Sequence, residues 1–106
     1  MAKIKKTSKN LTPGEIKEGL KALPGWHYFS DVKTISAEYE TKNFMAAVKA
    51  IKKIARLAEK DGHHPDLHLT RYRHLKIALS THEAGGVTEK DFHLARQIKI
   101  KSASVL

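Results

Sequence analysis

The spacing of apolar positions along the chain predicts three amphipathic helices. The first is expected between Thr12 and Pro24, the second from Asn43 to Gly62, and the third from Thr88 onward. Asparagine and threonine are good N-caps, and glycine and proline are frequent helix stops. The apolar stripes, at spacings of three and four, comprise Ile16, Leu20 and Leu23, then Phe44, Ala47, Val48, Ile51, Ile54, Ala55 and Ala58, and finally Phe92, Ala95 and Ile98.

Alternation with period two predicts four strands between these helices. The expected strands cover residues 26–29, 32–40, 67–72 and 75–80, with one turn at Ser30-Asp31 and a tight connection near Arg73-His74. The order is helix, two strands, helix, two strands, helix. Hairpins favour an antiparallel sheet, and amphipathic helices need a surface to cover. The prediction is an α+β two-layer sandwich: a four-stranded antiparallel sheet with three helices on one face.

Length and composition narrow the class of protein. A chain of 106 residues predicts one domain over residues 1–106. The absence of cysteine excludes disulfides, thiolate zinc sites and cysteine nucleophiles. Residues 1–10 are basic and are expected to form a flexible arm. Because no apolar run follows them, we expect neither a secretory signal nor a membrane span, and therefore a cytoplasmic protein.

The formal net charge of +9 and the isoelectric point near 9.9 raise the question of nucleic-acid binding. The lysines, however, are spread over the arm, the second helix and the tail. No aromatic residues are interleaved with them to stack on bases. We therefore expect no specific nucleic-acid partner.

Three histidines stand where elements end, in His63-His64-Pro65 and Thr81-His82. Histidine exchanges protons near neutral pH, and residues at element ends often carry function. Pro65 biases His64 toward extended backbone. If the two strands after Pro65 form a hairpin, His82 returns to the end of the sheet from which His64 departs. Without an obvious nucleophile, this set indicates acid/base chemistry such as elimination of water.

Other interpretations of these residues remain open. Adjacent residues on extended backbone point opposite ways, which argues against one metal held by both His63 and His64, although a three-histidine zinc site is an alternative. Asp91 fits the third position of a capping box that begins at Thr88. Glu59 fits a solvated residue near a helix end. Most simply, four further histidines are surface or satisfied polar residues: His27, His68, His74 and His93.

The stretch from Ala58 to Ile98 resembles the pterin-4a-carbinolamine dehydratase family. The family pattern is an acidic residue, three others, His-His-Pro, an aromatic residue, a histidine and a later aspartate. Here these positions are Glu59, His63-His64-Pro65, Tyr72, His82 and Asp91. The order of helices and strands agrees over nearly the whole chain. In contrast, Leu67 stands where many relatives have tryptophan, and Gly62 where animal members have an acidic residue.

The resemblance implies a hydro-lyase that converts 4a-hydroxytetrahydrobiopterin to quinonoid dihydropterin in tetrahydrobiopterin recycling. It implies that His64 and His82 form the acid/base pair and that His63 binds or orients the pterin. The candidates for binding and supporting roles are Glu59, Pro65, Tyr72, Thr81 and Asp91. No cofactor and no metal are expected, and relatives suggest a homodimer or homotetramer. The alternatives are a pterin-binding protein of molybdopterin metabolism and a non-enzymatic dimerisation cofactor or transcriptional coactivator.

Overall fold

The computed structural model describes residues 9–103 and residue 106. The helices are α2 (Pro13–Leu20), α3 (Phe44–Asp61) and α4 (Glu89–Lys101), with a short 3₁₀ turn η1 (His82–Ala84). The strands are β1 (Trp26–Phe29), β2 (Thr34–Glu40), β3 (Asp66–Thr70) and β4 (His74–Leu79). Every neighbouring pair is antiparallel, and the order across the sheet is β1-β2-β4-β3.

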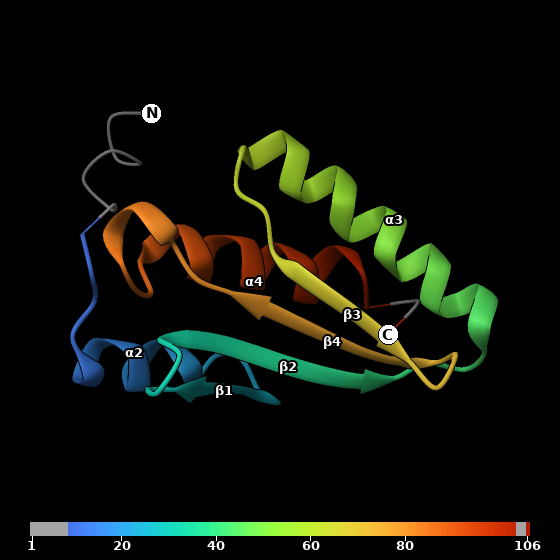
Figure 1. Ribbon diagram of the computed structural model, residues 1–106, viewed down its shortest axis with the longest axis horizontal. Coiled ribbons are helices and arrows are strands. Elements are labelled where there is room, and N and C mark those ends of the chain that lie inside the picture. Colours follow the sequence, from blue (N-terminus) through green and yellow to red (C-terminus); the bar gives the residue numbers. More distant parts are fainter. Residues whose placement is uncertain (1–8, 104–105) are drawn as a thin grey trace.

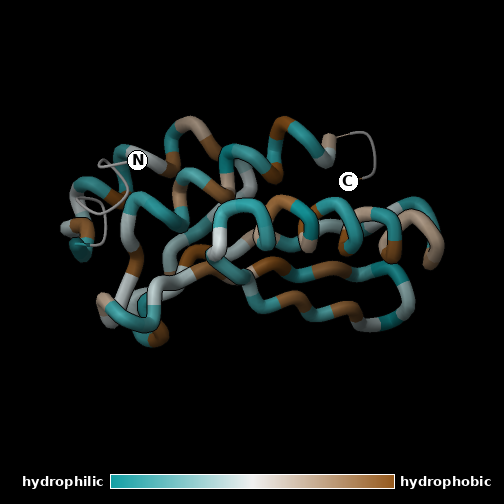
Figure 2. Tube along the Cα trace, turned by 90° about the horizontal axis from the view of Figure 1, so that it is seen from above, coloured by the Kyte–Doolittle hydropathy of each residue, from teal (hydrophilic) through white to brown (hydrophobic). Residues whose placement is uncertain are grey.

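The three helices cover one face of this sheet and leave the other face open (Figure 1). The core contains one side of each central strand, for example Ile35 on β2 and Ile77 on β4, packed with helix residues such as Ile54 and Ile98. The intervening strand positions Glu38 and Lys76 are exposed. Hydrophobic positions therefore alternate along the strands and recur along the helices (Figure 2), and the predicted fold class is confirmed.

The helix ends follow from local sequence. Thr12 caps α2 and Thr88 caps α4, each through a reciprocal capping box, and the Asn43 side chain accepts from Ala46 N–H at the start of α3. The first helix is shorter than predicted. It ends at Leu20, so Leu23 joins the core from the turn that follows the helix.

The second hairpin turns earlier than predicted. Arg71 and Tyr72 have φ of 47° and 56°, so two successive left-handed residues reverse the chain between Thr70 and His74. Glycine or asparagine usually marks such a turn, and neither is present here, so the residues at this position do not predict it. The prediction of a connection near Arg73-His74 was therefore wrong by about one or two positions, and His74 is already paired in β4.

Of the expected flexible arm, residues 1–8 lie outside the described residues. Asn10, the last residue of the arm, and Leu11, which follows it, are hydrogen-bonded to the rest of the fold. The Asn10 side chain donates to Ala84 O at 2.7 Å, and Leu11 N–H donates to Val87 O at 2.9 Å. Among the described residues, no helix has the length and apolar character needed to cross a membrane.

Candidate functional site

The end of α3 positions the paired histidines. Gly62 adopts a left-handed conformation with φ of 64°, and His63 N–H donates to Ala58 O at 3.1 Å, which closes the helix. His63 then turns toward the start of α4. Its side chain is only 11% exposed, and its Nε2 atom lies 2.6 Å from Oδ1 of the fully buried Asp91.

Asp91 is the centre of a buried hydrogen-bond network. Its Oδ2 atom accepts from the Thr81 hydroxyl at 2.8 Å and from Thr88 N–H at 2.9 Å. The two threonine hydroxyls are 2.8 Å apart. Because Thr81 uses its only hydroxyl proton on Asp91, Thr88 must donate to Thr81 in that contact. In the tautomer of His63 that donates from Nε2 to Asp91, Nδ1 is left for another partner.

His64 lies outside this network. Its Nε2 atom is 2.6 Å from Oε2 of Glu59, and the two side chains are 63% and 76% exposed. The sequence predicts that the side chains of His63 and His64 point in opposite directions. Their partners agree with this, because each ring contacts a carboxylate from a different helix. Among residues 9–103 and 106, no group of three or more His, Cys, Asp and Glu side chains is arranged to hold a metal ion.

His82 begins η1, which follows β4 after Ser80 and Thr81. The short turn is closed by Gly85, with φ of 72°, and by a bridge between Thr81 and Gly86. The register pairs Asp66 of β3 with Ala78 of β4, so His64 and His82 flank the same end of the hairpin. The return of the chain to this end of the sheet agrees with the sequence, and convergence of the imidazole rings themselves stays a prediction.

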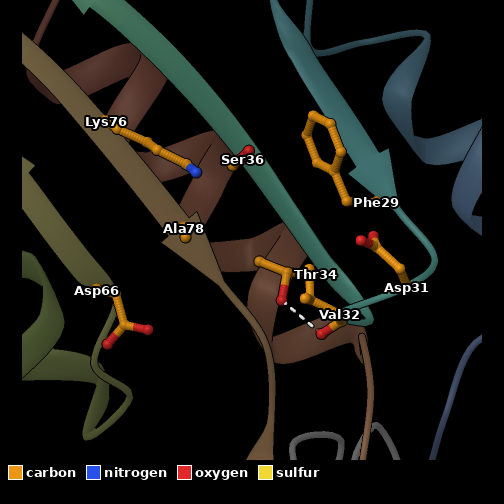
Figure 3. A pocket seen from close by; sticks show the side chains of 8 residues that line it. All are labelled: Phe29, Asp31, Val32, Thr34, Ser36, Asp66, Lys76 and Ala78. Atoms are coloured by element: carbon orange, nitrogen blue, oxygen red, sulfur yellow. Dashed lines mark hydrogen bonds between the residues drawn. The ribbon is translucent and has the colours of Figure 1, made fainter.

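His82 lines a cavity of about 230 Å³. The remaining lining residues come from the β1–β2 turn, from the end of β4 and from the loop after η1: Asp31, Val32, Lys33, Ser80, Thr81, Gly85 and Gly86. A second cavity of about 400 Å³ opens on the uncovered sheet face (Figure 3). It shares Asp31 and Val32 with the first, and the sequence pattern predicts Asp31 only as a turn residue.

Glu83 is a further charged residue of this region, and the sequence pattern does not predict it. A hydrogen bond from its own backbone holds the pKa of its carboxyl below the usual range, and its electrostatic interactions with Lys90, His63 and His82 act in the same direction. An ionised carboxylate therefore accompanies the histidines. Only its position directly after His82 could have suggested it.

Two predicted binding residues differ in their placement. Pro65 is half-buried between His64 and β3. Tyr72 instead lies in the turn between β3 and β4, at the end of the hairpin away from His64 and His82 (Figure 1). Its side chain is 62% exposed, with the Arg73 guanidinium 5.9 Å from its ring centroid. Within one chain the structure does not bring Tyr72 to the histidines.

Comparisons with known proteins agree on one family. The sequence model described as Pterin 4 alpha carbinolamine dehydratase matches residues 9–100. A protein of Aquifex aeolicus provisionally named pterin-4-alpha-carbinolamine dehydratase is 41% identical over 90 residues, 85% of this chain and 88% of its own. One from Acidobacterium capsulatum, with the same provisional name, is 44% identical over 89 residues, 84% and 94% of the two chains.

The fold has a solved counterpart as well. The crystal structure of transcriptional coactivator/pterin dehydratase from Brucella melitensis superposes with a TM-score of 0.81 at 34% sequence identity. The match covers 86% of this chain and 96% of that one.

Proposed function

Since the chain belongs to the pterin-4a-carbinolamine dehydratase family, we propose that it dehydrates 4a-hydroxytetrahydrobiopterin to quinonoid dihydropterin by histidine acid/base catalysis, in tetrahydrobiopterin recycling. The observation that carries this proposal is that the segments bearing the three histidines lie at one end of the β3–β4 hairpin. One is fixed by a buried carboxylate and another lines a cavity.

The reaction needs two proton transfers and no change of oxidation state. The bond between C4a and its hydroxyl oxygen breaks, and the departing hydroxide takes a proton from a general acid to become water. A general base takes the proton of N5, whose electron pair then forms the double bond to C4a. Imidazoles suit both steps because their pKa lies near neutrality.

The three histidines divide these tasks according to their surroundings. His82 and His64 form the acid/base pair, because His82 faces the cavity and His64 has an exposed ring that can exchange protons with solvent. Glu59 accepts from the His64 ring and holds its orientation. His63 is bonded to Asp91 and offers Nδ1 as a fixed group that binds or orients the pterin.

Metal-free catalysis is part of the proposal. The two carboxylates that engage His63 and His64 come from α4 and α3 respectively, so each imidazole already has a separate ionic partner. Activity should survive exhaustive treatment with a chelator. Loss on chelation with recovery on adding zinc would replace proton transfer by a metal mechanism.

We also expect a cytoplasmic homodimer or homotetramer. The sheet order leaves β1 and β3 as edges, and an unpaired edge strand is a ready surface for pairing with a second copy. Light scattering on the purified protein measures the oligomeric state directly.

The decisive test is an assay of the purified protein with 4a-hydroxytetrahydrobiopterin, compared with the spontaneous dehydration of the same solution. We expect a rate proportional to the enzyme concentration. If 7,8-dihydrobiopterin binds but dehydration is not accelerated, a pterin-handling role in molybdopterin metabolism takes precedence. If neither occurs, the non-enzymatic coactivator alternative gains support.

A further inference from the structure

The two cavities described above adjoin at the β1–β2 turn, one at His82 and the other on the open face of the sheet. The smaller, of about 230 Å³, contains His82, and the larger, of about 400 Å³, extends over β2 and β4. Asp31 and Val32 belong to the walls of both. A ligand that fills the first cavity and has a substituent can therefore place that substituent in the second.

The bonding of the pterin ring identifies this substituent. C6 is bonded to N5, and N5 is bonded to C4a, so the C6 side chain begins one atom from the reacting nitrogen. We propose that the larger cavity is the subsite for the C6 substituent and that it selects an uncharged, hydroxylated side chain. This inference rests on the proposed function, because it takes His82 as the residue that faces C4a and N5.

Hydrogen-bond donors and hydrogen-bond acceptors both line the larger cavity. Lys76 extends from β4 toward Ser36 on β2 (Figure 3), and Ser36 is only 4% exposed. The lysine ammonium donates hydrogen bonds, and the carboxylates of Asp31 and Asp66 accept them. The serine hydroxyl can donate and accept. A side chain with two hydroxyl groups, each a donor and an acceptor, can use such a lining. A methyl group cannot.

The charges of the lining disfavour anionic side chains. Asp31 and Asp66 contribute two negative charges against the one positive charge of Lys76. A phosphorylated or carboxylated substituent would meet this net negative lining and be repelled. A neutral diol loses nothing in the same field.

Apolar side chains complete the subsite. Phe29, Val32 and Ala78 line the same cavity and can cover the carbon atoms of a short chain. The volume of about 400 Å³ falls in the usual range of small-molecule sites, roughly 300–1,000 Å³. Both the polar and the apolar parts of a dihydroxypropyl group thus find matching surfaces.

The test compares two substrates that differ only at C6. These are 4a-hydroxytetrahydrobiopterin, with a dihydroxypropyl group, and its 6-methyl analogue. In the unmodified protein we expect kcat/KM to be about tenfold higher for the former. Lys76→Met and Ser36→Ala should each lower this ratio about fivefold, the scale of one lost hydrogen bond. Lys52→Met, at an exposed position of α3, is the matched control and should keep the original ratio.

A binding arm separates failure of the subsite from failure of the proposed function. The dissociation constants of 7,8-dihydrobiopterin and 6-methyl-7,8-dihydropterin need no turnover, and the same tenfold preference and fivefold losses are expected. Equal affinity for the two ligands, or unchanged ratios in both variants, overturns the subsite even in an active enzyme.

Preference for a phosphorylated C6 side chain overturns the proposed charge selection of the subsite. Absence of dehydration with the expected binding ratios rejects the proposed function and retains the subsite. Thermal unfolding of each variant confirms that the fold is intact.

Discussion

The Nε2 atom of His63 lies 2.6 Å from Oδ1 of Asp91, although the two residues are 28 positions apart. Asp91 is also the third residue of the α4 capping box, where its other oxygen accepts from Thr88 N–H. The same carboxylate therefore fixes the beginning of a helix and the orientation of an imidazole. The interpretation of Asp91 as a helix cap is confirmed, and its supporting role in the site stays a prediction that the contact with His63 favours.

Replacing this carboxylate tests the coupling. In Asp91→Asn, one side of the amide presents N–H groups to donors, so a buried bond is lost and the His63 ring is no longer held. We expect kcat to fall roughly a hundredfold, because small misplacements of positioned groups have effects of that size. The free energy of unfolding should fall by about 1–3 kcal/mol. Steady-state kinetics and chemical denaturation measure the two effects.

The matched control is Asp61→Asn, which alters an aspartate 3.6 Å from the exposed His93 and should leave kcat unchanged. A positioning role for Asp91 also predicts a changed pH–rate profile with KM close to its original value. If Asp91→Asn were less stable but kept its kcat and pH profile, the contact with His63 would be structural only.

The acid/base assignment has its own test. His64→Ala and His82→Ala should each lower turnover by roughly a hundredfold or more, the usual scale for removing a general acid or base. Both residues are exposed, so the midpoint of thermal unfolding should change little. His68→Ala removes another exposed histidine, on β3, and serves as control. Unmodified rates in both site variants are incompatible with the assignment.

The sequence predicted those features that depend on local pattern. The capping residues, the helix stripes and the four strands follow from neighbours a few positions apart, and so does the placement of His63, His64 and His82 at element ends. The contact between His63 and Asp91 depends on how the end of α3 meets the start of α4. The cavities depend on Asp31 lying beside His82 after the sheet has formed. Such long-range juxtapositions leave no periodic signal, and the motif position of Tyr72 likewise says nothing of its place in space.

The approach of α2 to α4 depends on a glycine. A Cβ atom at Gly19 would lie 2.7 Å from Cε1 of Phe92, a ring that is only 2% exposed. Alanine normally favours a helix, but here the ring must move within a packed core. Gly19→Ala should lower the free energy of unfolding by about 1–3 kcal/mol, the usual effect of overpacking. Gly14→Ala, in the same helix with its nearest neighbour at 3.9 Å, is the control. Stabilisation of Gly19→Ala would contradict the close contact.

An ion cluster on the open face gives stability a defined pH dependence. The His74 ring lies 3.0 Å from Oε1 of Glu40 and 2.9 Å from Oε1 of Glu38. Hydrogen bonds to Glu40 first, and then to Glu38, raise the pKa of His74 above its ordinary 6.5. The bond from His74, together with the charges of Arg73 and Arg71, lowers the pKa of Glu40 below its ordinary 4.5.

The sign of the effect follows from these directions. A raised histidine pKa stabilises the fold fully below pH 6.5, and this contribution is lost as the pH rises through the raised value. A lowered glutamate pKa stabilises the fold above pH 4.5 and is lost as the pH falls through the lowered value. The cluster therefore contributes most between these two ordinary values.

The measurement is the difference in unfolding midpoint between the unmodified protein and His74→Gln. We expect the unmodified protein to be more stable at about pH 5.5, within the window set by those pKa directions, and the difference to shrink steadily as the pH rises above neutrality. Because the glutamates are more than half exposed, added salt should also reduce the difference. His27→Gln, on the same open face, controls for loss of an exposed imidazole. A difference that stays constant or grows with pH would mean that His74 does not act through its charge.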